Sequence, residues 1–442
     1  MKLRTLLASV IGLLTCCHLV SAQRLSNGGL SFQTYEKSAD TKTDYNVLLG
    51  DLALEFNYIG GLLYDDNSNR SPDVSYDRFG EENIDDDDAF QTTNGIGTRL
   101  FYPITPGLTF DASFFVNYVW TINGDGNDGV FLSGAELLGD TAASFDLTLV
   151  ANDQHTIILS DHFGVFDDVI DYDFGRAHED LTYFENTLAL QWEYAISPLM
   201  TFGLRGERVN AFSKESDLDF VDHIDHTITT KLAFQLQPDL TVAPFLTYTE
   251  TDFDDNLVYF EFGPTSSRFA GNNDARTYSG GITADYLLSP AIRLIGGLGW
   301  TYVDADDNRN AKRDDKNEGI TTYIGLQQDV TELFKHSLSF EIVREAALAV
   351  EVNTREVYST AYEFDWQFAP EFILTGRVYW QHIDETDKGE MGDEFQESLT
   401  LTYLLNDKAQ IAIWARRTDR QSDLELREYR RNEIGVRWAY KF

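Results

Sequence analysis

Long segments of this chain alternate apolar and polar residues with a period of two, and this alternation constrains the fold more than any other feature. In residues 108–120 the apolar and aromatic side chains occupy the even positions, while Thr109, Asp111 and Ser113 lie between them. That period is the signature of a β-strand with one apolar face. The segments run about ten to fourteen residues, about twice the usual strand of a soluble β-sandwich. The same pattern recurs in residues 184–194, 372–381 and 398–405.

Very short turns join these segments in pairs. Many of them contain Pro or an Asn-Asp pair, which preset the backbone for tight reversals. Successive turns lie roughly forty to fifty residues apart, which fits two membrane strands of about ten residues each and one longer loop. The eight expected turns are residues 104–107, 151–154, 196–199, 237–240, 288–291, 329–332, 369–371 and 405–408.

The other connections are long, acidic and polar, such as residues 166–180 and 304–315. Hydrocarbon does not tolerate such loops, so they must lie outside it. Short turns on one side and long loops on the other are typical of a transmembrane antiparallel up-and-down β-barrel, an all-β fold. Eight turns connect sixteen strands, and a first strand at residues 52–58 and the last strand raise the total to about eighteen. Sixteen strands is the alternative, because residues 131–150 alternate least regularly.

Aromatic residues gather at both ends of the expected strands, as they do at the two membrane interfaces of a barrel. Phe115 and Tyr379 instead have the parity of an inner wall, but two such residues are too few to indicate an aromatic path for sugars. The interface residues near the turns are Tyr102, Tyr194, Phe202, Phe234, Tyr286, Phe368, Phe372, Tyr403 and Phe442, and those near the loops are Trp120, Tyr248, Trp300, Trp380 and Trp414.

The N-terminus has the layout of a secretory signal peptide: a positive start, an apolar stretch at residues 6–14 and a small-residue end at Ala22. The apolar stretch is too short to cross a bilayer as a helix. A lipid anchor on Cys16 or Cys17 is disfavoured because Thr15 precedes the first of them. The expected division is residues 1–22 as signal peptide, 23–50 as a periplasmic or lumenal segment, and 51–442 as the barrel.

Composition excludes several other classes of protein. The two cysteines both lie in the expected signal peptide, so the mature chain has no disulfide and no thiol site. A formal net charge of -39 excludes nucleic-acid binding through a basic patch. A mean hydropathy of -0.30 and the absence of a long apolar stretch exclude a helical membrane protein. They do not exclude a barrel, because only alternate residues of its strands face lipid.

The last ten residues resemble the C-terminal recognition signal of bacterial outer-membrane proteins. Glu433, Gly435, Trp438 and Tyr440 fill the places of that signal, and the chain stops on Phe442. The resemblance implies insertion into the cell outer membrane by the barrel-assembly machinery, with lipid and lipopolysaccharide as neighbours. The outward aromatics would sit at the membrane interface.

The whole chain is also similar to the bacterial β-barrel porin families. The residues behind this similarity are the recurring turns of the type Tyr-x-(Leu/Ile)-Ser-Pro, at residues 194–198 and 286–290, and the early acidic segment at residues 65–69. The similarity implies a barrel with a pore, but no particular substrate.

Enzyme chemistry is not expected, and neither is a cofactor. His223 and His226 are three residues apart, which places them on opposite faces of a strand, and no Gly-x-Ser-x-Gly elbow occurs. Asp304, Asp306 and Asn308 resemble the start of a calcium loop. That loop needs Gly where Arg309 stands, so a solvated acidic loop is the preferred interpretation and no metal is expected.

Parity along the strands places a set of charged residues on the inner wall of the expected barrel. With Arg293 and Lys441 near the periplasmic rim counted as well, acids slightly exceed bases on this wall, and the loops, including residues 85–88, add most of the negative charge at the outer mouth. The sequence therefore predicts a channel for small hydrophilic solutes with a modest preference for cations. A non-transport barrel, serving as a surface scaffold, an adhesin or a polysaccharide-export component, is the alternative. The inner-wall residues are Glu55, Arg99, Asp111, Asp146, Glu193, Arg205, Glu207, Lys231, Asp285, Glu341, Glu363, Asp365, Arg377 and Arg437.

Overall fold

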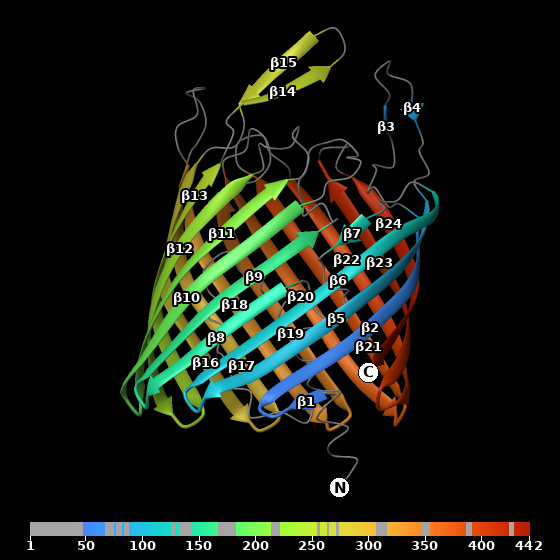
Figure 1. Cartoon of the computed structure of the whole chain (residues 1–442). Helices are drawn as coiled ribbons and strands as arrows, with labels where there is room; N and C mark the ends of the chain where they lie inside the picture. The colour runs from blue at the N-terminus through green and yellow to red at the C-terminus, as the bar shows by residue number, and fades with distance from the viewer. Residues whose placement is uncertain are drawn as a thin grey trace.

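The computed structural model consists of a closed antiparallel β-barrel (Figure 1). It describes residues 47–66, 75–76, 82–83, 88–124, 129–131, 143–166, 183–213, 222–253, 257–262, 265–270, 274–305, 316–346, 354–385, 391–423 and 428–442. The expected signal peptide and residues 23–46 lie outside this part of the chain. No helix long and apolar enough to cross a membrane occurs within it.

The main sheet has twenty strands, of which β1 and β7 are three-residue additions, so eighteen strands form the wall. The expectation of eighteen is confirmed, and sixteen is wrong. These strands are β2 (Leu52–Asp65), β5 (Ala89–Thr105), β6 (Leu108–Gly124), β8 (Ala143–Asn152), β9 (His155–Phe166), β10 (Tyr183–Ser197), β11 (Met200–Ser213), β12 (His223–Gln237), β13 (Leu240–Phe253), β16 (Ala275–Ser289), β17 (Ile292–Ala305), β18 (Lys316–Thr331), β19 (Phe334–Ala346), β20 (Thr354–Ala369), β21 (Phe372–Glu385), β22 (Met391–Asn406), β23 (Ala409–Ser422) and β24 (Tyr429–Lys441).

Each wall strand pairs with its neighbours in the sequence, and the barrel closes where β24 pairs antiparallel with β2. The strand β1 (Val47–Leu49) pairs with the start of β2, and β7 (Gly129–Phe131) pairs with β6. Two small hairpins stand apart from the main sheet: β3 (Ser75–Tyr76) with β4 (Glu82–Asn83), and β14 (Leu257–Phe262) with β15 (Thr265–Ala270). Of the stretch 131–150 that alternates least regularly, residues 132–142 lie outside the described part, and the rest falls mainly in β8, which at ten residues is the shortest wall strand.

All eight expected turns are present, each as a tight reversal between consecutive strands. They lie together at one end of the barrel, the end at which the chain also finishes (Figure 1). The turns follow from local chemistry, as at Asn152, whose side chain accepts hydrogen bonds from the backbone N–H groups of Gln154 and His155. Because the turns occupy one end, the long acidic segments are expected at the opposite end.

The two faces of each strand differ sharply in chemistry. On β17, Leu298 and Trp300 point outward with 61% and 53% of their surface exposed, whereas Thr301 on the other face is fully buried. On β12, Ile228 is likewise exposed while Thr229 is buried. A continuous apolar outer surface of this kind is unfavourable in water and favourable in hydrocarbon. The period of two read from the sequence is therefore the division between a lipid face and an inner face.

Glycines lie where large aromatic rings cross the neighbouring strand. The indole of Trp438 covers Gly60 on the outer face, and that of Trp414 covers Gly435 on the inner face. A Cβ atom on Gly435 would come within 2.5 Å of the Trp414 ring, so only glycine fits there. Gly60 is equally crowded, because a Cβ atom there would clash with the Trp438 ring.

Trp414 corrects one sequence-based expectation. It was predicted to belong to the interface aromatics near the loops, yet it is buried and faces inward. The reason is local: residues 411–415 are all apolar, so alternation does not reveal which face of β23 meets lipid.

Candidate functional site

The polar inner face of the barrel is the candidate functional site. All fourteen charged residues predicted for the inner wall lie on the strand face opposite the exposed apolar side chains. Each strand places them there through its period of two, because neighbouring positions carry exposed residues such as Leu190, Tyr362 and Trp366. That a path for solutes runs along this face remains a prediction.

Ion pairs join most of these charges. The pair expected within one strand, Arg205 with Glu207, is present. The other pairs link residues on adjacent strands, except that Lys231 on β12 reaches across β11 to Glu193 on β10. They are Arg99–Asp111 at 3.0 Å, Lys231–Glu193 at 3.9 Å, Arg293–Asp285 at 2.6 Å, Arg377–Glu363 at 3.2 Å and Lys441–Glu55 at 3.1 Å. Asp365 accepts a hydrogen bond of 2.8 Å from Thr375, and the guanidinium of Arg437 lies 5.3 Å from the centre of the Trp414 ring.

Sequence reasoning missed a group of charged residues in the loop-side halves of β19 to β24 and of β2. Extending the parity of each strand toward its loop end would have found them, because they continue the same inner face. The inner-face residues missed are Asp65, Glu345, Arg355, Glu385, Glu394, Arg416, Arg420, Arg431 and Glu433.

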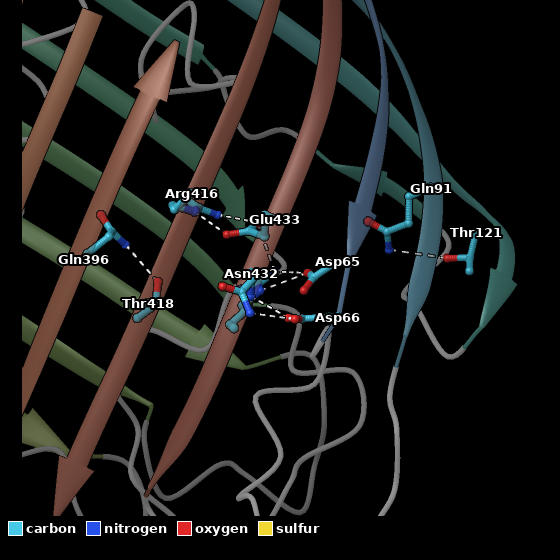
Figure 2. Close-up of polar contacts among 10 residues, drawn as sticks. Asp65, Asp66, Gln91, Thr121, Gln396, Arg416, Thr418, Asn432 and Glu433 are labelled. Carbon is cyan, nitrogen blue, oxygen red and sulfur yellow. Dashed lines mark hydrogen bonds and ion pairs between the residues drawn. The ribbon is translucent and has the colours of Figure 1, made fainter.

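Six residues of the closing strands form what we call the seam network: Asp65, Asp66, Arg416, Arg431, Asn432 and Glu433. Figure 2 shows side chains from β23, β24 and the end of β2 turned toward one another.

Within the seam network, Arg431 binds Asp65 at 2.6 Å and approaches Glu433 at 3.5 Å, and Arg416 pairs with Glu433. The side chain of Asn432 donates to Asp66 at 2.7 Å. Asp65 and Glu433 retain only 1% and 2% of their surface, so these carboxylates depend on their arginine partners.

The inner face of β12 to β18 is different in kind. Seven hydroxyl residues there, which we call the hydroxyl wall, are joined by hydrogen bonds across neighbouring strands. The bonds are Thr227–Thr249 at 3.0 Å, Thr229–Thr247 at 3.2 Å, Ser279–Thr301 at 2.8 Å and Thr301–Thr321 at 3.1 Å.

Carboxylates are in surplus on the inner face. Asp146, Asp225 and Glu341 make no ion pair with any described residue, whereas the lysines and arginines named above have acidic or aromatic partners. A low-dielectric wall with unpaired carboxylates holds a negative potential in the space that it encloses. An arrangement of this kind attracts cations.

Aromatic side chains are more frequent on the inner face than the sequence suggested. Phe115 and Tyr379 are buried there as expected, and Trp414, Phe245 and Tyr323 lie on the same face. The parity of β13 and β18 could have revealed Phe245 and Tyr323.

The histidine and metal candidates do not come together. His223 and His226 lie on opposite faces of β12, as predicted. In the part of the chain that the structure describes, no group of three or more metal-ligating side chains occurs. Asp304 lies next to the last residue of β17, whereas Asp306, Asn308 and residues 85–87 lie outside the part of the chain that the structure describes.

The C-terminal residues complete the wall. Trp438 and Tyr440 point outward on β24, Gly435 lies inward beneath Trp414, and the Tyr440 and Phe442 rings meet edge to face at 5.3 Å. The backbone N–H of Phe442 donates to the carbonyl of Phe56 at 3.1 Å, so the last residue joins the first wall strand.

A closed eighteen-strand barrel with an apolar outer face, a polar inner face and short turns at one end defines a class. The chain is an antiparallel up-and-down β-barrel of the kind that spans bacterial outer membranes.

No protein-family model and no curated protein matches the chain. Solved structures with a similar fold include a BenF-like porin from Pseudomonas fluorescens Pf-5, 12% identical, which covers 88% of this chain and 99% of that one with a TM-score of 0.47. OpdQ from Pseudomonas aeruginosa is 10% identical over 89% and 99% of the two chains, with a TM-score of 0.46. OccAB3 from Acinetobacter baumannii is 12% identical over 88% and 99%, with a TM-score of 0.45. At these identities the likeness concerns the fold alone.

Proposed function

We propose that this barrel is a channel for passive diffusion of small hydrophilic solutes, with a modest preference for cations. Eighteen strands enclose more space than side chains ordinarily fill, so a water path is the default for a barrel of this size. Charged and hydroxyl side chains are spread over the inner face, which suits hydrated solutes rather than lipids.

The observation that carries the cation preference is the surplus of carboxylates on the inner face. Arg99, Arg293 and Arg377 are each held by an acid, while Asp146, Asp225 and Glu341 have no cationic partner among the described residues. Excess negative charge raises the local concentration of cations and repels anions. The acidic loops expected at the outer mouth act in the same direction.

Reversal potentials of the purified protein in planar bilayers test this proposal. In a gradient of potassium chloride we expect a potential of the sign set by cation permeation, which shrinks as the mean salt concentration rises. At 1 M salt the Debye length is roughly 3 Å, so the fixed charges are screened. A preference for anions would refute the cation part of the proposal.

A non-transport barrel is the second candidate, and one observation favours it. Thr301 and Val303 on the inner face of β17 are fully buried, and Ala275 and Ala305 beside them are nearly so. Burial of inner-face residues at this level is what a locally filled passage would produce. Absence of any conductance from folded protein would support this reading, in which the barrel serves as a scaffold, an adhesin or a part of polysaccharide export.

Export and assembly belong to the same proposal. We expect the signal peptide to be removed after Ala22, so that the mature chain begins at Gln23, and the barrel-assembly machinery to recognise β24. N-terminal sequencing of the membrane-extracted protein checks the first point. A lipid-bearing start at Cys16 or Cys17 would contradict it.

A further inference from the structure

Glu341 is exceptional among the inner-face carboxylates. It lies in the middle of β19, on the inner face, and only 7% of its surface is exposed. It makes no hydrogen bond and no ion pair with any residue that the structure describes. An ionised carboxylate that is buried without a partner is strongly unfavourable, so it must take a countercharge or a proton from the solution.

The surroundings of Glu341 supply oxygen atoms rather than positive charge. Its register partners on the two flanking strands are Tyr323 and Ser359, and Ser339 precedes it on the same face of β19. Glu345 lies four residues further along the same face of β19, where it pairs with Arg355 at 2.8 Å. Carboxylate and hydroxyl oxygens are the donors that hard cations prefer.

The cationic side chains on the flanking inner faces are already engaged. Arg377 pairs with Glu363 at 3.2 Å, Arg293 with Asp285 at 2.6 Å and Arg355 with Glu345 at 2.8 Å. None of these ion pairs includes Glu341. The protein therefore leaves this one buried carboxylate to be neutralised from outside.

We infer that Glu341, with the hydroxyl oxygens around it, is a transient binding site for a monovalent hard cation, potassium or sodium, in the wall of the channel. The inference rests on the proposed cation-preferring channel and deepens it by naming the site at which the permeating ion is held. A channel conducts when such a site binds strongly enough to draw the ion in and weakly enough to release it.

Conductance as a function of potassium chloride concentration tests the site. Wild-type protein is expected to approach saturation as the site fills, whereas Glu341→Gln, which keeps the shape and removes the charge, should conduct in proportion to salt. The same variant should lower the potassium-to-chloride permeability ratio about tenfold, because one unit charge about 6 Å away in water favours the cation about threefold and disfavours the anion by the same factor.

Asp146→Asn is the matched control. Asp146 is also an unpaired inner-face carboxylate, but it is only partly buried and faces Asp111 across the strand pair. Its neutralisation should lower the permeability ratio less and leave the saturation in place. If Glu341→Gln saturates as the wild type does, Glu341 holds a proton and the inference is wrong; a linear response in the wild type also overturns it.

Failure of the channel proposal itself can be told apart. If folded wild-type protein does not conduct, crystals soaked in rubidium chloride provide a second readout. An anomalous peak beside Glu341 that disappears in Glu341→Gln would uphold the cation site without the channel. Absence of that peak in the wild type would overturn the site as well.

Discussion

At the closure of the barrel, charged side chains of the seam network join the first and last wall strands, whereas hydroxyl groups of the hydroxyl wall join strands in the middle of the chain, between β12 and β18. The seam network joins Arg431 to Asp65, 366 residues apart in sequence. The hydroxyl wall joins residues about twenty apart, such as Thr301 to Thr321. Tight turns already set the register of consecutive strands, but no turn connects β24 to β2. Ion pairs at the seam therefore fix a register that no turn sets, whereas pairs such as Arg293–Asp285 and Arg377–Glu363 join strands that a turn already aligns.

The pairing of β2 with β24, which closes the barrel, is also shorter than the pairing of β2 with its other neighbour, β5. Nine residue pairs join β2 to β24, from Asn57 with Lys441 to Asp65 with Glu433, whereas thirteen pairs join β2 to β5. Gly60 and Gly61 lie in the middle of that pairing. The ion pair of Lys441 with Glu55 near one end and that of Arg431 with Asp65 near the other hold the seam beyond the glycines.

The largest effect is expected from changing the outer face of the seam. Replacing Trp438 and Tyr440 together by Ser should reduce outer-membrane yield by about tenfold or more, because these aromatics anchor the terminal strand at the interface. Fractionation and heat-modifiability on gels measure the folded yield.

The control for that prediction removes a comparable aromatic pair from other strands. Phe372 and Tyr403 stack at 4.9 Å on β21 and β22, and their replacement by Ser should leave most of the insertion intact. Equal loss in both variants would show that the girdle as a whole, rather than the terminal strand, is what assembly requires.

A second effect is expected on the inner face of the seam. Asp65→Asn should lower the free energy of unfolding by about 3 kcal/mol, because it leaves Arg431 beside a neutral group in a buried position. Urea unfolding of the barrel in lipid vesicles measures the change.

The neighbouring residue offers the matched control. Asp66 accepts hydrogen bonds from the backbone and side chain of Asn432, which carries no charge, so Asp66→Asn should cost only about 1 kcal/mol. If both variants lose the same stability, the ion pairs contribute no more to the seam than ordinary hydrogen bonds do.

The hydroxyl wall should be more tolerant than the seam network. Thr301→Val keeps the side-chain shape but removes the hydroxyl between Ser279 and Thr321, at a cost of about 1 to 2 kcal/mol. The same unfolding assay applies. A loss as large as that of Asp65→Asn would erase the distinction between the two regions.

The smallest effect is expected from the acidic residues at the outer mouth, which lie in neither the seam network nor the hydroxyl wall, and it concerns the cation preference. Neutralising Asp85 to Asp88 as Asn should lower the cation preference by less than about twofold at 0.1 M salt, because charges further than about 10 Å from the ion path are largely screened. The fold should not change. Reversal potentials decide the matter, and a larger loss than that of Glu341→Gln would place the selectivity in the loops.

Sequence alone determined the architecture. The eight turns, the eighteen strands and the face on which residues such as Arg99 and Glu341 lie all follow from local features, because turn chemistry sets each reversal and a strand has a strict period of two. Where the period fails, as in residues 411–415, so does the prediction, and Trp414 was placed on the wrong face.

Only the tertiary structure decided which inner-face charges meet. Asp65 and Arg431 belong to the first and last wall strands, and nothing in either local sequence shows that closure of the barrel brings them to 2.6 Å. The same holds for Glu341, because a carboxylate is left without a partner only once every neighbouring cation has taken another. Parity is a property of one strand, whereas pairing is a property of the closed wall.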